Sequence, residues 1–248
     1  MNIDSILSAF PKVRPELSAA HQEKYLEEIK INRGEEGGLF YRLLVKLESW
    51  MHVRVASFDK DELALEIGAG TLNHRPYESE VTAYDVVEPI EALYENSPHR
   101  DGIRHFYGDI AELKLTPTYG RVLTIAALEH VERLPEMLAR VGLMLREDGQ
   151  LRAGIPSEGG FLWGASWRCT TGILYRLRTG LPYAPLMRSE HINDAEEIVA
   201  LAGHFFGDVA IRRFPLPFLH LSFYTFFVAS RPKREICRAY LERIGNGK

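Results

Sequence analysis

A glycine turn directly after a short apolar run is the feature that most constrains the fold of this chain. Residues 63–67 form the run, and Gly68-Ala69-Gly70 follows at once. The run predicts a buried strand, and glycine lets a ligand lie against the backbone because it has no Cβ and tolerates positive φ. Such a loop after the first strand of an open α/β sheet is a common binding site for nucleotide-like ligands.

Further apolar runs follow the glycine turn at intervals of about twenty residues. They predict strands over 81–87, 102–107, 121–127 and 151–156. Strands that alternate with crossover segments indicate a parallel sheet with right-handed connections. The carboxyl ends of all these strands then lie at one edge of the sheet.

Acidic residues stand at several of these strand ends, namely Glu66, Glu88, Asp109 and Glu129. We expect them to share one crevice with Gly68. Glu88 follows the glycines at the spacing where an acidic side chain accepts hydrogen bonds from ribose hydroxyls. Asp109 suits an adenine amine, and Ile110 offers an apolar surface to the ring.

The ordered pattern resembles the class I S-adenosylmethionine-dependent methyltransferases. Its elements are Glu66-x-Gly68-x-Gly70, Glu88-Pro89, Gly108-Asp109 and Leu128-Glu129-His130, and they cover about residues 60–157. Within that family the chain is similar to the small-molecule branch, methyltransferase type 11, which includes ubiquinone-type and sugar O-methyltransferases. The resemblance is specific for the cofactor and not for the acceptor.

The resemblance implies an α/β, Rossmann-like fold with a mostly parallel seven-stranded sheet and helices on both faces. The runs at 209–214 and 219–229 would supply edge strands, including the reversed last strand. We expect a single domain over 1–248. Its parts are an N-terminal helical addition (1–59), a cofactor-binding core (60–156), a helical substrate lid inserted after strand 5 (157–193), and the rest of the core with a tail (194–248).

The implied cofactor is S-adenosyl-L-methionine, with S-adenosyl-L-homocysteine as product. The residues expected to bind it are Glu66, Gly68, Ala69, Gly70, Glu88, Asp109, Ile110 and Ala127. A dinucleotide-binding oxidoreductase is the nearest rival, but its phosphate fingerprint requires a third glycine where this chain has Asn73. A second alternative is a non-catalytic S-adenosylmethionine-binding sensor or partner subunit.

The segments on either side of the glycine turn carry further expectations. Pro76 predicts that the first crossover helix is short, with His74 in a surface or capping role rather than a catalytic one. Residues 16–31 are typical of a charged, exposed helix, and residues 40–51 of an amphipathic helix packed on the sheet. By the resemblance, Tyr41 or Arg42 reaches the methionine carboxylate.

Two histidines are candidate general bases for an acceptor hydroxyl, because an imidazole titrates near neutral pH. His130 begins the helix after the fourth strand, and His191 precedes Asn193-Asp194, a predicted N-cap. The alternative for both is that they only shape their loops. Cys169 and Cys237 are the only cysteines, which argues against a cysteine-ligated zinc site, and we expect no metal.

The predicted lid combines aromatic side chains with arginines. We expect Trp163, Trp167, Arg176, Arg178 and Arg188 to bind the substrate. The guanidinium group matches phosphate or carboxylate, so the predicted acceptor is a small molecule with an anionic group, such as a nucleotide-linked sugar. The alternative is a helical subdomain whose arginines face solvent.

Composition is consistent with a globular enzyme and restricts its partners. The chain has 248 residues and a formal net charge of −4, so no general attraction to nucleic acid or anionic membranes is expected. No apolar stretch approaches the length of a membrane span, and the first residues do not resemble a signal peptide. We therefore expect a cytoplasmic protein, with a homodimer as one option. The acceptor, and whether O or N is methylated, stay open.

Overall fold

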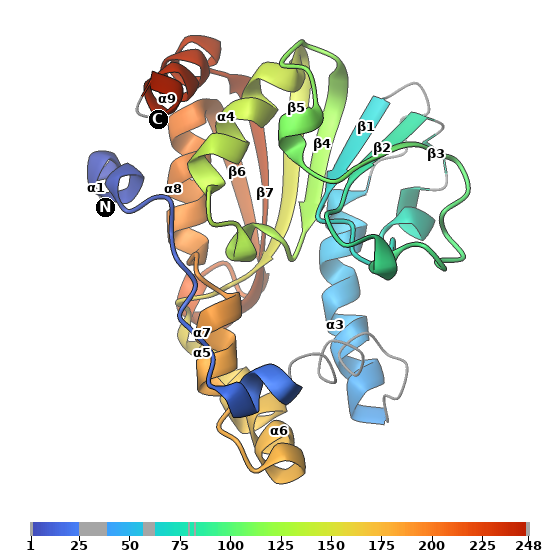
Figure 1. The fold of residues 1–248 in the computed structure, drawn as a ribbon, viewed down its shortest axis with the longest axis vertical. Helices are drawn as coiled ribbons and strands as arrows, with labels where there is room; N and C mark the ends of the chain where they lie inside the picture. The colour runs from blue at the N-terminus through green and yellow to red at the C-terminus, as the bar shows by residue number, and fades with distance from the viewer. Residues whose placement is uncertain (1, 25–38, 57–62, 79, 82, 247–248) are drawn as a thin grey trace.

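A seven-stranded sheet with helices on both faces forms the centre of the structure (Figure 1). The structure is a computed structural model, and it describes residues 2–24, 39–56, 63–78, 80–81 and 83–246. The expected fold class is therefore confirmed.

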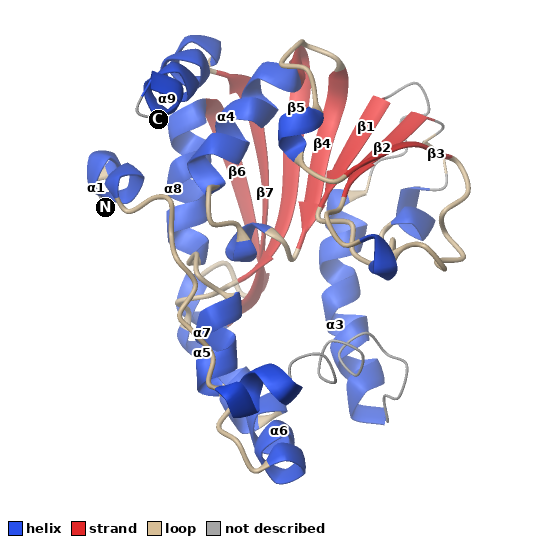
Figure 2. Cartoon of the chain, viewed as in Figure 1, coloured by secondary structure: helices blue, strands red, loops and turns tan. Residues whose placement is uncertain are grey.

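The strand order is β3-β2-β1-β4-β5-β7-β6 (Figure 2). Neighbours from β3 to β5 pair in parallel, while β7 is antiparallel to both β5 and β6. The reversed strand thus lies between β5 and the edge strand β6. The bounds are β1 Leu63–Ile67, β2 Ala83–Val87, β3 Ile103–Tyr107, β4 Tyr119–Ile125, β5 Leu145–Pro156, β6 Phe206–Pro215 and β7 Ser222–Pro232.

The two faces of the sheet are covered unequally. In Figure 1, α1, α4, α8 and α9 lie on one side and α3 on the other. The described α-helices are α1 Ile3–Ser8, α3 Leu39–Val55, α4 Leu134–Met144, α5 Phe161–Cys169, α6 Thr171–Thr179, α7 Ala184–Glu190, α8 Ala195–Phe205 and α9 Arg234–Asn246. Single 3-10 turns are η1 Arg75–Glu78, η2 Glu91–Leu93, η3 Ile110–Glu112, η4 Leu128–His130 and η5 Leu219–Leu221.

Alternation along the strands assigns apolar side chains to two cores. Leu65 and Ile67 join the core beneath α4 and α8, whereas Ala64 joins the core beneath α3. Gly154 permits close packing of α3, because a Cβ there would lie 2.9 Å from the Cβ of Met51. The helix predicted over 40–51 is confirmed as part of α3.

The connection between β1 and β2 contains only the 3-10 turn η1 among its described residues. Pro76 lies within this turn. A proline inside a longer helix would remove a backbone hydrogen bond and clash with the preceding turn. The predicted short crossover is thus confirmed.

A buried polar network lies between η1, β4 and α3. The guanidinium of Arg121 donates to both carboxylate oxygens of Glu78, at 2.6 and 2.7 Å. His74 bonds the same carboxylate at 3.0 Å and contacts His52 at 3.0 Å. Burial opposes ionisation of Glu78, but the bonds from Arg121 and His74 outweigh burial and lower the pKa of its carboxyl.

The expectation of a surface or capping role for His74 is therefore wrong. Its side chain is fully buried and paired with Glu78, four residues further along the chain. The short 3-10 turn folds Glu78 back under α3, where Arg121 neutralises it.

Removing only one partner of this network should be strongly destabilising. Arg121→Met leaves the Glu78 carboxylate buried without its cation, and we expect a loss of about 3–5 kcal/mol in the free energy of unfolding. In Arg121→Met/Glu78→Gln the uncompensated charge is gone, so part of the stability should return. Urea unfolding measures both. If the double variant has a lower free energy of unfolding than the single variant, the proposed pairing of Arg121 with Glu78 is contradicted.

The helices α5, α6 and α7 come between β5 and α8 along the chain, and they project beyond the carboxyl edge of the sheet (Figure 1). An aromatic cluster joins them: the ring of Tyr183 lies 5.8 Å from that of Trp167 and 5.2 Å from that of Tyr175. We call residues 157–193 the inserted segment, since its role as a lid stays a prediction.

Residues 11–21, here the N-terminal strap, run along the inserted segment and α8 (Figure 1). Lys12 donates to the carbonyl of Ile192 at 2.7 Å and pairs with Glu197. The imidazole of His21 contacts the carbonyl of Pro182 at 2.9 Å and is buried. Of the helix predicted over 16–31, residues 19–24 are helical and residues 25–31 lie outside the described part.

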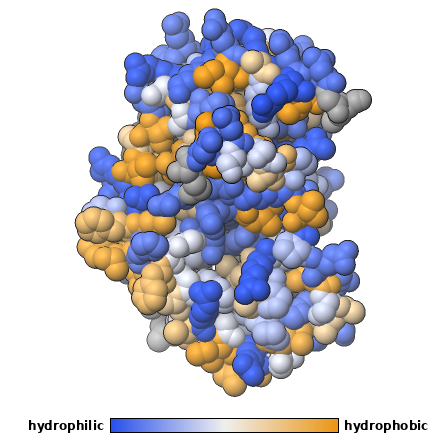
Figure 3. All heavy atoms as spheres, turned by 90° about the vertical axis from the view of Figure 1, so that its left-hand side faces the viewer, coloured by the Kyte–Doolittle hydropathy of each residue, from blue (hydrophilic) through white to orange (hydrophobic). Residues whose placement is uncertain are grey.

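On the face at the left of Figure 1, hydrophilic and hydrophobic residues are interspersed (Figure 3). Within the described ranges, no helix combines the length and apolar character that crossing a membrane requires.

Candidate active site at the carboxyl edge of the sheet

The glycine turn after β1 has the backbone conformation that its sequence predicts. Gly68 and Gly70 have φ values of +73° and +52°. The amide of Gly68 donates to the carbonyl of Val87 at 2.9 Å, which holds the turn against β2. A Cβ on Gly68 would lie 2.5 Å from that of Ala127, whereas one on Gly70 would meet nothing within 4 Å. The turn therefore packs on the end of β4 at one glycine and faces open space at the other.

Glu88 joins this turn directly. One of its carboxylate oxygens accepts the amide of Gly70 at 2.8 Å, and the other accepts that of Ile90 at 3.0 Å. The amide of Glu88 donates to the carbonyl of Tyr107 at 2.9 Å, so β3 also ends beside it. A carboxylate has about four acceptor positions, so Glu88 keeps capacity for two further donors such as ribose hydroxyls.

Asp109 stands one strand further along the same edge. It is the N-cap of η3, where it accepts the amide of Ala111 at 2.8 Å and forms a capping box with Glu112. Its side chain is exposed, and Ile110 is partly exposed beside it. Both are accessible at the sheet edge, and their contact with an adenine ring stays a prediction.

Glu66 is placed differently from the other cofactor candidates. Its side chain is buried on the α3 side of the sheet and accepts the hydroxyl of Tyr84 at 2.8 Å. Burial raises the pKa of its carboxyl to about 6, more than the charge of His74 lowers it. Its predicted role in cofactor binding is untested, and its bond to Tyr84 is structural.

The raised pKa of Glu66 should make stability fall as pH rises. The unfolded chain ionises this carboxyl near its ordinary pKa of 4.5, and the folded chain only near 6. The contribution of Glu66 to the free energy of unfolding thus falls by about 2 kcal/mol as the pH rises past these two pKa values. Glu66→Gln keeps an acceptor for Tyr84 but does not titrate, so its stability relative to the parent should rise between pH 4 and 7.5. Parallel urea titrations at both pH values check this, and a constant difference would contradict it.

The two glycines should respond differently to alanine. Positive φ costs each substitution about 1–2 kcal/mol. Gly68→Ala should lower the free energy of unfolding more than Gly70→Ala does, because the new methyl group at position 68 would collide with Ala127. Urea unfolding of both variants, with Gly203→Ala in α8 as a control that meets no nearby atom, measures the difference. Equal losses at the two positions would contradict the close packing on β4.

The two predicted bases lie side by side. The rings of His130 and His191 are 5.0 Å apart and nearly perpendicular. Nδ1 of His130 lies 2.7 Å from the carbonyl oxygen of Glu190, and Nδ1 of His191 lies 2.8 Å from the carboxylate of Glu158. Both acceptors favour a proton on Nδ1, which leaves Nε2 of the neutral ring with its lone pair.

Glu129 completes this group from beneath. Its carboxylate is buried, Oε2 has no hydrogen-bond partner in the described part of the chain, and Oε1 lies 3.8 Å from Nε2 of His130. Burial raises the pKa of this carboxyl to about 7, although His130 acts in the opposite direction. One donor atom each from Glu129, His130 and His191 lies within 4.8 Å of the others, an arrangement that could hold a metal ion.

Asn193 fixes the relative position of the two histidine loops. Its buried amide nitrogen donates to the carbonyls of Leu128 and Val131, both at 2.8 Å. The amides of Ile192 and Asn193 both donate to the carbonyl of Glu129, at 2.9 and 3.1 Å. Asp194 is the N-cap residue of α8 but makes no capping bond with its side chain. The expected capping function is therefore replaced by a clamp between the two loops.

Arg14 of the N-terminal strap supports the same loop. Its guanidinium donates to the carbonyl of His130 at 2.8 Å and lies 3.4 Å from the carboxylate of Glu190. The strap thus touches the main chain of the residue whose side chain faces the site.

The predicted substrate residues separate into three groups. Trp163 faces the histidines: its ring stacks on that of His191 at 6.2 Å, and its indole donates to Glu158. Trp167 is buried within the inserted segment beside Tyr183. The arginines at 176, 178 and 188 are exposed on α6 and α7.

Three residues near the histidines were missed by sequence reasoning. Glu158 comes directly after β5 and Ser157, so the rule that selected Glu88 could also have found it. Glu48 on α3 and Tyr224 on β7 carry no comparable signal. The carboxylates of Glu48 and Glu158 both raise the pKa of Glu129, which places them near it. The side chains of Tyr41 and Arg42 lie outside the described part of the structure.

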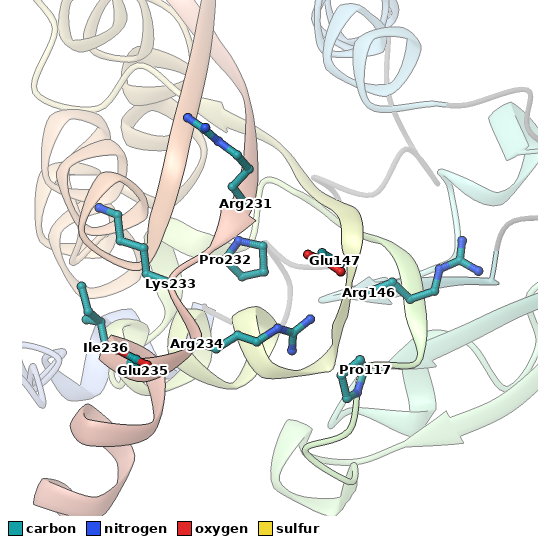
Figure 4. Close-up of a pocket in the computed structure, with 9 residues that line it drawn as sticks. All are labelled: Pro117, Arg146, Glu147, Arg231, Pro232, Lys233, Arg234, Glu235 and Ile236. Atoms are coloured by element: carbon teal, nitrogen blue, oxygen red, sulfur yellow. The ribbon is translucent and has the colours of Figure 1, made fainter.

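A separate hollow lies at the opposite edge of the sheet (Figure 4). Its lining includes Pro117 before β4, Arg146 at the start of β5 and Arg234 at the start of α9. None of the predicted site residues lines it. This hollow is therefore separate from the candidate site at the carboxyl edge.

A comparison with models of protein families gave no match, and neither did one with curated proteins. Solved structures do match. A methyltransferase of Thermotoga maritima, described as a possible histamine N-methyltransferase, has a TM-score of 0.51 and 16% identity over 77% of this chain and 97% of its own. An S-adenosylmethionine-dependent methyltransferase of Mesorhizobium loti has a TM-score of 0.52 and 13% identity over 74% of this chain and 98% of its own.

A third match is phosphoethanolamine N-methyltransferase 2 of Haemonchus contortus, in complex with S-adenosyl-L-methionine. Its TM-score is 0.52 at 12% identity, over 76% of this chain and 53% of its own. The chain has the fold of S-adenosylmethionine-dependent methyltransferases. Identity this low establishes the fold, and function is argued from the site.

Proposed function

We propose that this protein is an S-adenosylmethionine-dependent methyltransferase that acts on an oxygen or nitrogen atom of a small molecule. The observation that carries the proposal is the contact between Glu88 and Gly70 beside open space. It joins the carboxylate that would hold a ribose to the glycine turn that a ligand can approach closely. In this fold, that combination supports binding of an adenosyl group.

The residues of the chain fit such a ligand. Glu88 would accept the two ribose hydroxyls, and Asp109 the adenine amine, with Ile110 against the ring. Gly68, Ala69 and Gly70 would line the ligand on one side and Ala127 at the end of β4 on the other. Glu66 lies deeper, and its predicted role is the least supported because its carboxylate already bonds Tyr84.

The cofactor would supply an electrophilic methyl group on a sulfonium, so the protein mainly has to position an acceptor atom in line with it. His130 and His191 support this role, because each presents an unprotonated Nε2 when neutral. Either would take the proton of an acceptor hydroxyl during transfer. Trp163, stacked on His191, would form a wall of the acceptor site.

The class of acceptor is a further part of the proposal. Arg176, Arg178 and Arg188 would bind a phosphate or carboxylate of the acceptor, with the inserted segment acting as a lid. Their exposure on α6 and α7 requires that this group project toward solvent. The proposed location is cytoplasmic, and a homodimer remains part of the prediction.

A non-catalytic S-adenosylmethionine-binding protein is the alternative of a different class. It would need the adenosyl residues and no acceptor site. The convergence of His130, His191 and Trp163, which would form an acceptor site, favours an enzyme over such a sensor.

Binding through Glu88 can be tested directly. Glu88→Ala removes the proposed ribose acceptor, and we expect the affinity for S-adenosylmethionine to fall at least about tenfold, or 1.4 kcal/mol. Glu91→Ala, an exposed carboxylate in η2, is the matched control and should bind as the parent does. Isothermal titration calorimetry measures all three proteins.

The same variants separate enzyme from sensor. Release of S-adenosylhomocysteine is measured with sugar nucleotides, catechols, amines and carboxylates as acceptors. An enzyme should turn over at least one of them, with less turnover in Glu88→Ala at limiting cofactor. Binding without turnover across the panel would favour the sensor, and absence of binding in the parent would reject both.

A further inference from the structure

The group formed by Glu129, His130 and His191 has a composition typical of metal sites. Two imidazoles and one carboxylate bind zinc and other divalent transition ions in many enzymes, with the remaining positions open. The three donor atoms here lie within 4.8 Å of one another. Ligands of one tetrahedral ion lie about 3.4 Å apart, given bonds of about 2.1 Å, so a side-chain shift of about one ångström closes the site.

The hydrogen bonds around the histidines orient them as metal ligands are oriented. In metal sites the second ring nitrogen usually donates to a carbonyl or carboxylate, which fixes the tautomer and the ring. Nδ1 of His130 has the carbonyl of Glu190, and Nδ1 of His191 has the carboxylate of Glu158. Glu158 is itself held by the indole of Trp163. This outer shell leaves Nε2 of each neutral ring available to an ion.

The unpartnered oxygen Oε2 of the Glu129 carboxylate is the second, independent observation. Its Oε2 is buried and has no hydrogen-bond partner among the described residues. A buried carboxylate oxygen without a hydrogen-bond donor is costly, and a cation beside it removes that cost. Glu48 and Glu158 add negative charge around it. Arg14 of the N-terminal strap bonds the main chain of His130 and pairs with Glu132 and Glu190.

Exposure shows how such an ion would reach the site. The side chain of Glu129 is only 2% exposed and forms the floor, whereas that of His130 is 31% exposed. His191, at 14%, lies between these extremes. The group is thus most accessible on the side of His130, where open coordination positions would lie.

We propose that Glu129, His130 and His191 bind one divalent transition-metal ion, with Glu158 as a positioning residue for His191. Metal binding does not require methyl transfer, but an ion held by Nε2 of both rings would take the place of the base role proposed for them, because the same lone pairs serve both. A role for the ion in holding an acceptor oxygen would rest on the proposed function. The chemical class is a borderline cation such as Zn²⁺ or Co²⁺ rather than Mg²⁺, which prefers oxygen ligands and retained waters.

The test is Co²⁺ and Zn²⁺ titration of the full chain after removal of any histidine tag. We expect one equivalent to bind, with visible ligand-field absorption for Co²⁺ and no binding of Mg²⁺. His130→Ala should lower the affinity about 100-fold or more, and Glu158→Gln about 10- to 100-fold. His130 is partly exposed, so its variant should fold, which circular dichroism checks. Glu129→Gln is a second ligand variant, and His99→Ala, an exposed histidine, is the control.

The outcomes distinguish this inference from the proposed function. Equal Co²⁺ affinity in the parent, His130→Ala and Glu129→Gln, or no stoichiometric binding in the parent, would overturn the metal site. Loss in His130→Ala with no change in Glu158→Gln would overturn the positioning role alone. Glu88→Ala should bind Co²⁺ normally even where it no longer binds S-adenosylmethionine, so failure of one proposal leaves the other measurable.

Discussion

The carboxylate of Glu88 joins the two structural units on which the candidate site depends. One unit is the end of β2, which its own amide ties to β3 through Tyr107. The other is the glycine turn, whose Gly70 amide it accepts. That bond acts together with the bond from the Gly68 amide to Val87 and the packing of Gly68 on Ala127 to fix the turn at the sheet edge. With the turn fixed, the first, second and fourth strands present their ends to the same volume.

The second half of the site depends on a different constraint. Parallel strands bring Glu129 and His130 to the edge, but His191 arrives from a segment that lies outside the sheet. The Asn193 clamp and the Glu129 carbonyl attach this segment to η4. The Asn193 side chain and two main-chain amides therefore hold the two loops together, and these loops carry the side chains of His130 and His191.

The strand pattern and Glu88 could be predicted from the sequence because both follow local rules. Apolar runs of strand length ended in acidic residues, and parallel strands place such ends together. The buried network escaped prediction, because Arg121 stands at the start of an apolar run and its partner Glu78 lies in a different element. The sequence context of Asn193-Asp194 fits a helix start, and Asp194 is indeed the N-cap residue of α8; only the fold reveals the carbonyls that Asn193 contacts.

The inserted segment was also only partly predictable. Its aromatic residues were recognised as a group, yet Trp163 turns to the histidines while Trp167 stays inside the segment. The same composition serves both positions, so sequence alone could not separate them. The exposed arginines at 176, 178 and 188 are a second example: the sequence shows their charge, but not that their side chains lie at the surface.

The N-terminal strap has a consequence for how sites of this kind diversify. Arg14 holds the main chain of His130, and Lys12 holds that of Ile192 beside His191, although neither strap residue belongs to the sheet. Replacements among these leading residues can therefore shift both imidazoles while the strands that carry the glycine turn and Glu88 stay unchanged. The geometry of the two imidazoles can in this way change through a peripheral segment of the chain, without the loss of stability that accompanies changes in a packed core.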